Sequence, residues 1–283
     1  MAYVFVLFAA VLWGTTGTAQ SFIDGDAHPL TIGAVRLTIG GFSLLGFAIL
    51  MKKLKLRGLV WRATILSAVS MALFQPLFFS AVQLTGIAVG TVVTIGSAPV
   101  LSGLIEWLVL RQRPDRVWVT ATLLAITGCV LLFAESDTVT INPFGIVAGL
   151  GGGLAFATYT IASKKVLERA ESMSAVAVIF SFAAVLLIPF LFIFDFSYAA
   201  APGNLAVLIY LGIGATTIAY LLFSSGLREI PSSSAVTLSL AEPLTAALLG
   251  VFLVGETLSA LSWTGVALLL GGIIAVTARQ RKS

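Results

Sequence analysis

The chain has 283 residues, of which 59% are hydrophobic and 10% are charged, and so much apolar surface cannot be buried inside a water-soluble globule. Its mean hydropathy of +1.08 indicates a membrane protein instead. The net charge of +4 does not indicate a nucleic-acid partner, because the basic residues are spread over short connections between apolar segments.

Ten apolar runs follow one another along the chain, each close to the roughly 20 residues that a helix needs to cross hydrocarbon. The runs lack the two-residue alternation of transmembrane β-strands. The expected fold is therefore an all-α membrane protein with ten transmembrane helices. The runs lie near 3–22, 30–51, 59–84, 88–110, 116–134, 143–165, 174–195, 203–226, 232–254 and 260–278.

Basic residues occupy every second connection between these runs and the C-terminal segment, which together hold 15 of the 16 in the chain. By the positive-inside rule both termini are then cytoplasmic, and we expect a multi-pass protein of the cell inner (plasma) membrane. Its expected partners are the lipid bilayer and a small-molecule substrate, with no nucleic acid, and we expect a monomer. The opposite connections carry the acidic residues Asp24, Asp26, Glu135, Asp137, Asp195 and Glu256.

The two halves of the chain share sparse identities at an offset of 144 residues, which places Pro99 on Pro243 and Gly128 on Gly272. We therefore expect an N-terminal repeat over 1–139 and a C-terminal repeat over 140–283, each of five helices. Because five is odd, the second repeat must be inverted relative to the first. Inverted repeats are typical of secondary transporters that work by alternating access.

Small residues recur every four positions in the sixth run, at Gly145, Gly149, Gly153 and Ala157. Such a stripe predicts close approach of a neighbouring helix. Cys129 is the chain's single cysteine, so the sequence holds no disulfide framework, and we interpret Cys129 as a small packing residue.

Glu242 is the sharpest candidate for function, because a carboxylate in the middle of an apolar run is costly in hydrocarbon and should face protein or water. It could bind a substrate ammonium group or carry a proton, or it could fix a helix contact. The adjacent Pro243 predicts a bend that leaves the backbone carbonyl of Ser239 without its helical partner.

Two other charged residues within the runs are interpreted as structural. Arg36 could hold a substrate carboxylate, but we favour a side chain that extends to the outer headgroups or ties two helices together. Glu106 lies near Arg111 and Arg113, and we expect a solvated local ion pair there.

Aromatic and small polar residues gather in corresponding runs of the two halves and predict a cavity with apolar walls and few polar anchors, suited to a small organic solute. We expect bending at Pro76, Pro99 and Pro243 to help gate this cavity. The candidate cavity residues are Trp13, Gln20, Gln75, Phe78, Phe79, Gln83, Thr91, Thr94, Tyr159, Tyr220, Ser239 and Glu242.

Signals for catalysis are poor, and we expect no catalytic residues, no metal site and no cofactor. His28, the chain's single histidine, lies in a connection, so it can form neither a catalytic triad nor a zinc site at membrane depth. A Walker motif is absent, so transport is not driven by an ATPase within this chain. A membrane-embedded enzyme and a non-transporting scaffold remain the alternatives of another class.

Four features together resemble the drug/metabolite transporter superfamily in its ten-helix EamA-type branch: Trp13-Gly14, Arg36-Leu37, the repeated Pro99 and Pro243, and 255–258 (Gly-Glu-Thr-Leu) before the last run. The first half departs from the pattern at Arg111-Gln112-Arg113, which suggests that Glu256 caps helices and does not take part in transport. The resemblance implies inner-membrane export of small metabolites, with a form similar to bacterial exporters of amino acids, including aromatic ones. A drug-like or sugar-nucleotide carrier is the alternative within the superfamily.

Overall fold

The computed structural model describes residues 1–25, 27–134, 142–255 and 257–278, and the secondary structure within these ranges is helical with no strand. The predicted boundary between 139 and 140 and the predicted cap Glu256 lie outside the described residues. So do Asp26, Glu135 and Asp137, three of the acidic residues counted in the connections.

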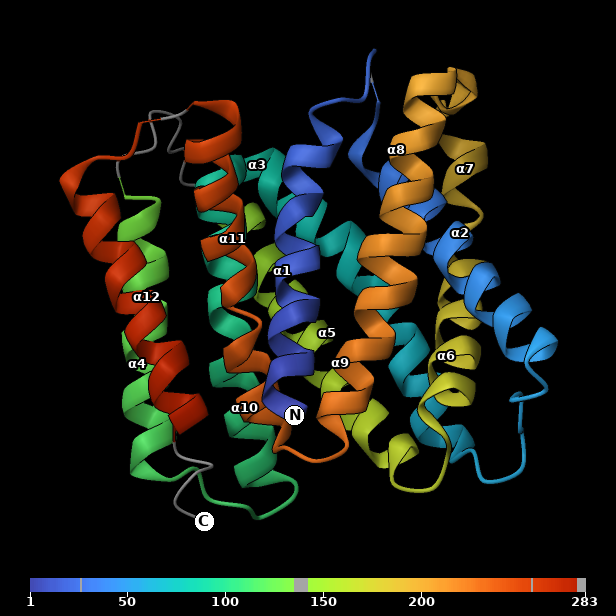
Figure 1. The fold of residues 1–283 in the computed structure, drawn as a ribbon, viewed down its shortest axis with the longest axis horizontal. Coiled ribbons are helices and arrows are strands. Elements are labelled where there is room, and N and C mark those ends of the chain that lie inside the picture. Colours follow the sequence, from blue (N-terminus) through green and yellow to red (C-terminus); the bar gives the residue numbers. More distant parts are fainter. Residues whose placement is uncertain (26, 135–141, 256, 279–283) are drawn as a thin grey trace.

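The N-terminal part of the bundle contains four helices, and two kinds of sequence signal explain where several helices of the chain begin. Pro29 and Pro143 stand in the first turn of their helices, where a missing N–H is harmless. The side chains of His28, Asp115 and Asn142 each accept a hydrogen bond from a backbone N–H of the helix that follows, which caps it. The helices are α1 (Ala2–Gln20), α2 (Pro29–Leu50), α3 (Trp61–Leu108) and α4 (Arg116–Leu132) (Figure 1).

In the C-terminal part the helices are repeatedly interrupted. A π-helical segment joins α8 to α9, and its Thr216 hydroxyl donates to the carbonyl of Leu211 five residues back at 2.9 Å. A second π-helical segment follows α11. The elements are α5 (Pro143–Leu167), α6 (Ser172–Leu187), α7 (Phe190–Ile193), η1 (Ser197–Ala200), α8 (Pro202–Gly212), η2 (Ile213–Ile218), α9 (Ala219–Leu227), α10 (Ser232–Leu238), α11 (Ala241–Leu249), η3 (Gly250–Val254) and α12 (Ala260–Ala278).

Eight of the described helices are long and apolar enough to cross a membrane, and α4 is a shorter apolar helix of 17 residues. Among the eight, α3 has 48 residues and would reach about 72 Å if it were straight, more than twice the thickness of a bilayer core. It is not straight, because Gly86 has φ 83° and ψ 163°. Gly90 packs back onto the backbone of Val82, so 61–85 and 87–108 form an antiparallel hairpin.

The helix break near Pro243 is present, but the backbone around it differs from the expectation. α10 ends at Leu238 and α11 begins at Ala241, so the break precedes the proline. The carbonyl of Ser239 is not free: it accepts from the N–H of Glu242 at 2.9 Å. The prediction of a free acceptor was wrong because the chain tightens into a short turn that satisfies it.

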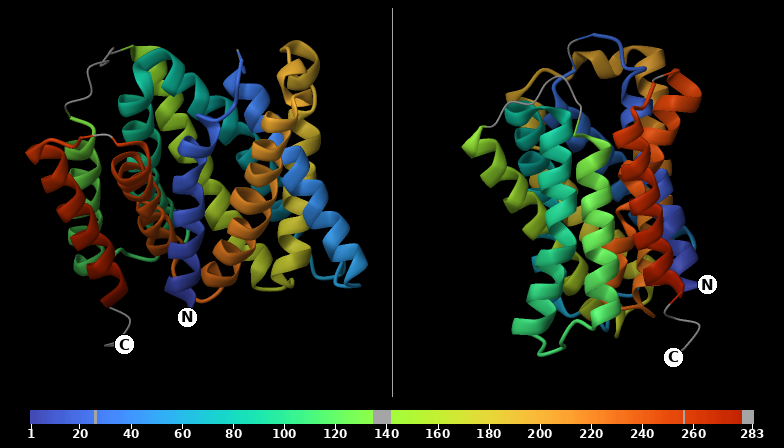
Figure 2. Two further views of the ribbon diagram at one scale, coloured as in Figure 1. Left: turned by 45° about the horizontal axis from the view of Figure 1, so that its top comes forward. Right: turned by 90° about the vertical axis from the view of Figure 1, so that its left-hand side faces the viewer.

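Glycines set the closest helix contacts of the bundle. The stripe predicted in α5 packs on α3, where a Cβ on Gly149 would lie 2.9 Å from Val93 Cγ1. Gly40 of α2 permits contact with η2, since a Cβ there would lie 2.6 Å from Thr216 Cγ2. At one edge of the bundle α12 packs along α4 (Figure 2). The close packing predicted for the α5 stripe is confirmed.

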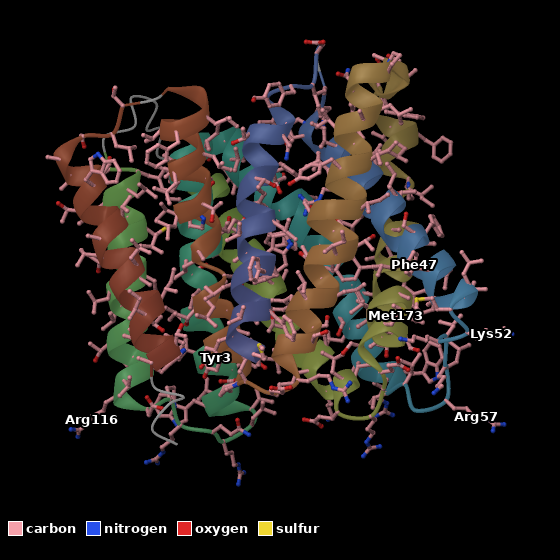
Figure 3. The ribbon with its side chains drawn as sticks, viewed as in Figure 1. Tyr3, Phe47, Lys52, Arg57, Arg116 and Met173 are labelled. Atoms are coloured by element: carbon pink, nitrogen blue, oxygen red, sulfur yellow. The ribbon has the colours of Figure 1, made fainter. Side chains whose placement is uncertain are left out.

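The two ends of the bundle differ in charge. α1 begins at the same end as the connection after α2, where Lys52 and Arg57 lie (Figure 3). Arg116, at the start of α4, lies at this end too and projects outward from the bundle (Figure 3). We call this end the basic end. The connection after α1 and the turn at Gly86 lie at the other end, which we call the opposite end.

Candidate functional site

A cavity of about 530 Å³ lies in the centre of the bundle. At the opposite end it reaches the last residues of α1, the first residue of α2, Ile87 beside the α3 turn, and Phe133. Toward the basic end it stops at Trp13, Phe156 and Tyr220. The walls come from α1, α2, both halves of α3, α5, α9, α10 and α11.

The cavity brings together ten of the twelve residues proposed for it from the sequence. These are Trp13, Gln20, Gln75, Phe78, Phe79, Thr91, Thr94, Tyr220, Ser239 and Glu242. Two others do not line it: Gln83 is exposed on α3, and Tyr159 is fully buried. Pro243 lines the cavity, whereas Pro76 and Pro99 lie within the helical halves of α3. Whether any of these residues binds a solute stays a prediction.

Buried side-chain atoms without a hydrogen-bond partner concentrate on the cavity wall. Six such atoms occur among the described residues, and five belong to residues that line the cavity. A buried polar group without a partner costs about 1–3 kcal/mol, so native proteins seldom tolerate a cluster of them unless a ligand or water occupies the space. The five are Trp13 Nε1, Thr16 Oγ1, Arg36 Nε, Gln75 Nε2 and Thr94 Oγ1.

Arg36 belongs to this cavity, and neither of the two structural contacts expected for it is present among the described residues. The side chain is only 8% exposed, so it does not extend to the headgroups, and it donates no hydrogen bond to any described residue. α2 places it in the wall because Gly33, Gly40 and Gly41 turn the close-packing face of the helix toward neighbouring helices. The sequence signal was present, since a charge within an apolar run is itself a functional hypothesis.

Glu242 stands on another wall of the same cavity, in the first turn of α11. α1 approaches this turn closely, because a Cβ on Gly14 would lie 2.6 Å from the Glu242 carbonyl oxygen. The charges of Arg36 and Glu242 are near enough to interact, yet neither residue takes part in an ion pair among the described residues. The cavity thus presents one cationic and one anionic group, and neither is neutralised by a direct partner.

A cluster of aromatic rings closes the cavity toward the basic end, and we call it the aromatic floor. Trp13 packs on Tyr220 with ring centroids 4.8 Å apart and on Phe223 at 5.2 Å. Tyr220 packs in turn on Phe180 at 4.3 Å. The floor consists of Trp13, Phe156, Tyr159, Phe180, Tyr220 and Phe223, which come from α1, α5, α6 and α9.

A layer of polar contacts lies between the floor and the basic end. Glu106 on α3 accepts a hydrogen bond from the backbone N–H of Ser233 at 3.1 Å, and Lys164 on α5 donates to the carbonyl of Ile230. Glu106 and Lys164 also interact electrostatically. Glu106 is only 7% exposed, so the prediction of a solvated local pair was wrong: the carboxylate turns inward, where a backbone N–H needs an acceptor.

This arrangement predicts unequal access to the two sides of the floor. The test uses single cysteines in a Cys129→Ala background. Thr16→Cys, in the cavity, should react with a small maleimide roughly tenfold faster than Ser163→Cys. Ser163 is only 2% exposed and lies near the C-terminal end of α5. Removing the acceptor with Glu106→Leu should loosen the layer and speed labelling of Ser163→Cys by about tenfold, since about 1.4 kcal/mol changes a population tenfold.

Glu106→Gln is the matched control, because its amide oxygen can still accept from Ser233. In the Glu106→Gln variant, the labelling rate of Ser163→Cys should lie between the rates in the wild-type and Glu106→Leu backgrounds. Equal labelling rates at positions 16 and 163 in the wild-type background would show that the floor does not close the cavity.

The all-helical bundle, its bilayer-length apolar helices and its central cavity define a multi-pass membrane protein of the transporter class. The model of the EamA-like transporter family matches residues 1–134 and 143–278. The chain belongs to this family. Transporters are not usually enzymes, and no group of histidine, cysteine and acidic residues that could hold a metal is found in the described part of the chain.

Curated relatives match over nearly the whole chain. "Uncharacterized transporter YwfM" of Bacillus subtilis (strain 168) is 48% identical over 279 residues, covering 99% of this chain and 94% of the relative. "Protein PecM" of Dickeya dadantii (strain 3937) is 31% identical, with 96% and 91% covered. "Uncharacterized inner membrane transporter YicL" of Salmonella typhimurium (strain LT2) is 26% identical, with 98% and 95% covered. A solved crystal structure, 23% identical, shares the fold with a TM-score of 0.86, covering 99% of this chain and 98% of the other.

Proposed function

We propose that this protein is a secondary transporter that exports small metabolites, with amino acids as the leading class, by alternating access through the central cavity. The observation that carries the proposal is a cavity that reaches one end of the bundle and is closed toward the other by the aromatic floor. Its volume of about 530 Å³ is within the usual range for sites that bind small molecules.

Ten membrane crossings fit the helices as they stand. The hairpin at Gly86 divides α3 into two crossings, α4 supplies a short one, and the remaining seven long helices supply one each. A chain of 17 residues in α4 reaches about 26 Å, close to the hydrocarbon thickness.

Inversion of the two halves is supported by the directions of their first helices. α1 starts at the basic end, whereas α5 finishes there, since Lys53 pairs with Glu171 just after α5 at 3.9 Å. At the other end of α5, Gly145 packs against Thr85 beside the α3 turn. The family model also matches two separate segments, 1–134 and 143–278, in keeping with a boundary between 139 and 140.

The charge distribution supports a direction for the transporter. If the basic end is cytoplasmic, both termini are cytoplasmic and the cavity faces outward. The name of the relative YicL, an inner membrane transporter, supports a location in the inner membrane. An outward-facing cavity is the releasing state of an exporter, and a chain without a Walker motif would draw on a solute or ion gradient.

The test is transport by purified protein in liposomes loaded with labelled amino acids, with and without an imposed proton gradient. We expect labelled solute to leave faster than from protein-free liposomes, and the gradient should change the rate if protons are coupled. Sugar nucleotides and cationic drugs are assayed in parallel. Movement of either of those in place of amino acids would reject the substrate class, and movement of no solute would reject transport.

A further inference from the structure

We infer that the cavity binds its substrate as a zwitterion, with a carboxylate held by Arg36, Gln75 and Trp13 and an ammonium group held by Glu242. The inference rests on the proposed transport function and names the two poles of that same site. Three observations carry it: unpartnered donors from α1, α2 and α3, an unpartnered carboxylate on α11, and aromatic side chains on the wall of the same cavity.

The unpartnered donors define the first pole. Trp13 Nε1, Arg36 Nε and Gln75 Nε2 are buried and have no hydrogen-bond partner, and each of these nitrogen atoms can only donate. Trp13, Arg36 and Gln75 are 5%, 8% and 3% exposed, so bulk water cannot replace the missing acceptors freely. Such a group of donors requires a ligand with clustered acceptor oxygens. A carboxylate fits, because its two oxygens match the geometry of a guanidinium group.

Gln75 and Arg36 lie beside the same stretch of α2. A Cβ on Gly33 would lie 3.3 Å from Gln75 Oε1, and Gly33 is one helical turn before Arg36. Gly33 therefore lets the amide approach α2 next to the guanidinium group. The amide oxygen faces the helix at this point, which is consistent with an amide nitrogen that remains available to a ligand.

Glu242 defines the second pole. Its side chain makes no hydrogen bond and no ion pair with the described residues, although it lines the cavity. Arg36 is near enough for the two charges to interact but does not neutralise the carboxylate by direct contact. An ammonium group is the ligand chemistry that would neutralise a carboxylate in an apolar setting.

Ligands with a single charge fit less well. A carboxylic acid without an amine would leave Glu242 unneutralised and repelled, and an amine without a carboxylate would do the same to Arg36. A zwitterion neutralises both groups at once. The cavity that holds both poles also has aromatic walls at Phe74, Phe78 and Phe156, with ring centroids 5.5–5.8 Å apart, which can accept an apolar substituent.

The test compares L-phenylalanine with 2-phenylethylamine, which lacks the carboxylate, and 3-phenylpropionate, which lacks the ammonium group. The same three-way set is prepared for leucine, methionine and tyrosine. Binding to the purified full-length protein is measured by isothermal titration calorimetry, and transport is measured in liposomes. We expect at least one zwitterion to bind roughly tenfold or more tightly than both of its single-charge analogues.

The variants assign the poles. Arg36→Gln should remove the preference for the zwitterion over its amine, and Glu242→Gln should remove the preference over its acid, each by roughly tenfold. A purely structural role would weaken all three ligands alike. Arg36→Lys, which keeps the charge but loses the planar fork, should give a partial loss.

Gln75→Ala and Gln83→Ala form a matched pair on the same half of α3. They test the carboxylate pole without changing a charge, so the test still stands if the variants at Arg36 or Glu242 fail to fold. Gln75→Ala should weaken ligands that carry a carboxylate, and Gln83→Ala should change nothing, because Gln83 is exposed outside the cavity.

The inference is overturned if an amine or an acid binds as tightly as every zwitterion tested, if no zwitterion binds, or if the variants weaken all ligands equally. Transport of a singly charged solute in the liposomes would overturn the inference and leave the transport function standing. Failure of every solute to move would count against the transport function itself.

Discussion

Gly17→Trp is expected to abolish transport without unfolding the protein. Gly17 lines the cavity, and a Cβ added there would meet no atom within 4 Å, so the indole can enter the cavity without displacing a neighbour. An indole that projects into this space of about 530 Å³ would compete with the substrate for it. Efflux from liposomes should fall by roughly tenfold or more, while the thermal unfolding midpoint stays close to that of the wild type.

Gly46→Trp is the matched control for this prediction. Gly46 also has open space around a Cβ, but it lies on α2 away from the cavity. It should transport at the wild-type rate. If both variants retain full transport, the solute passes by another route and the cavity is not the substrate site.

Gly272→Val should have the largest effect on stability. A Cβ on Gly272 would lie 2.6 Å from the carbonyl oxygen of Ala121 and 2.8 Å from Ala125 Cβ, so a valine must push α12 away from α4. Overpacking of this kind costs about 1–3 kcal/mol, and backbone atoms on both sides leave little room for relaxation. We expect a lower unfolding midpoint and a smaller yield of monodisperse protein.

The adjacent Gly271 supplies the control. A Cβ on Gly271 would meet no atom within 4 Å, so Gly271→Val changes the same helix by the same side chain without a clash. Its midpoint should match that of the wild type. A shared loss of stability in both variants would attribute the effect to the helix propensity of valine and would contradict the close packing of α12 on α4.

The sequence predicts the positions of the helices well because each depends on a local property, a run of apolar residues. Apolar length alone separated the two halves of α3, although the helix continues on both sides of Gly86 with no loop. The break before Pro243 was also predictable, because proline removes a helical hydrogen bond. The π-helical segment around Thr216 was not predictable from local sequence. It lies at a contact between distant helices, where Gly40 meets Thr216 and the hydroxyl of Thr217 donates to the carbonyl of Gly40.

It was harder to predict which side chains line the cavity or are buried than to predict where the helices lie. Gln75 and Gln83 lie on the same apolar run, yet only Gln75 meets the cavity, because the packing of neighbouring helices decides which face is enclosed. Arg36 was expected to extend to the headgroups or tie two helices together, and Glu106 to form a solvated ion pair. Both side chains turn inward and are buried: Arg36 lines the cavity, and Glu106 accepts a hydrogen bond from the backbone of Ser233.

The single residue Gly86 has a mechanical consequence. Its positive φ of 83° is available to glycine at little cost, and a side chain there would be strained. A single residue between them keeps the two halves of the α3 hairpin joined at this end, while the angle between the halves can change through the backbone of Gly86. Ile87, beside this junction, lines the cavity, and Glu106 lies near the other end of the same helical half. A change of angle at Gly86 would therefore move Glu106 relative to the cavity.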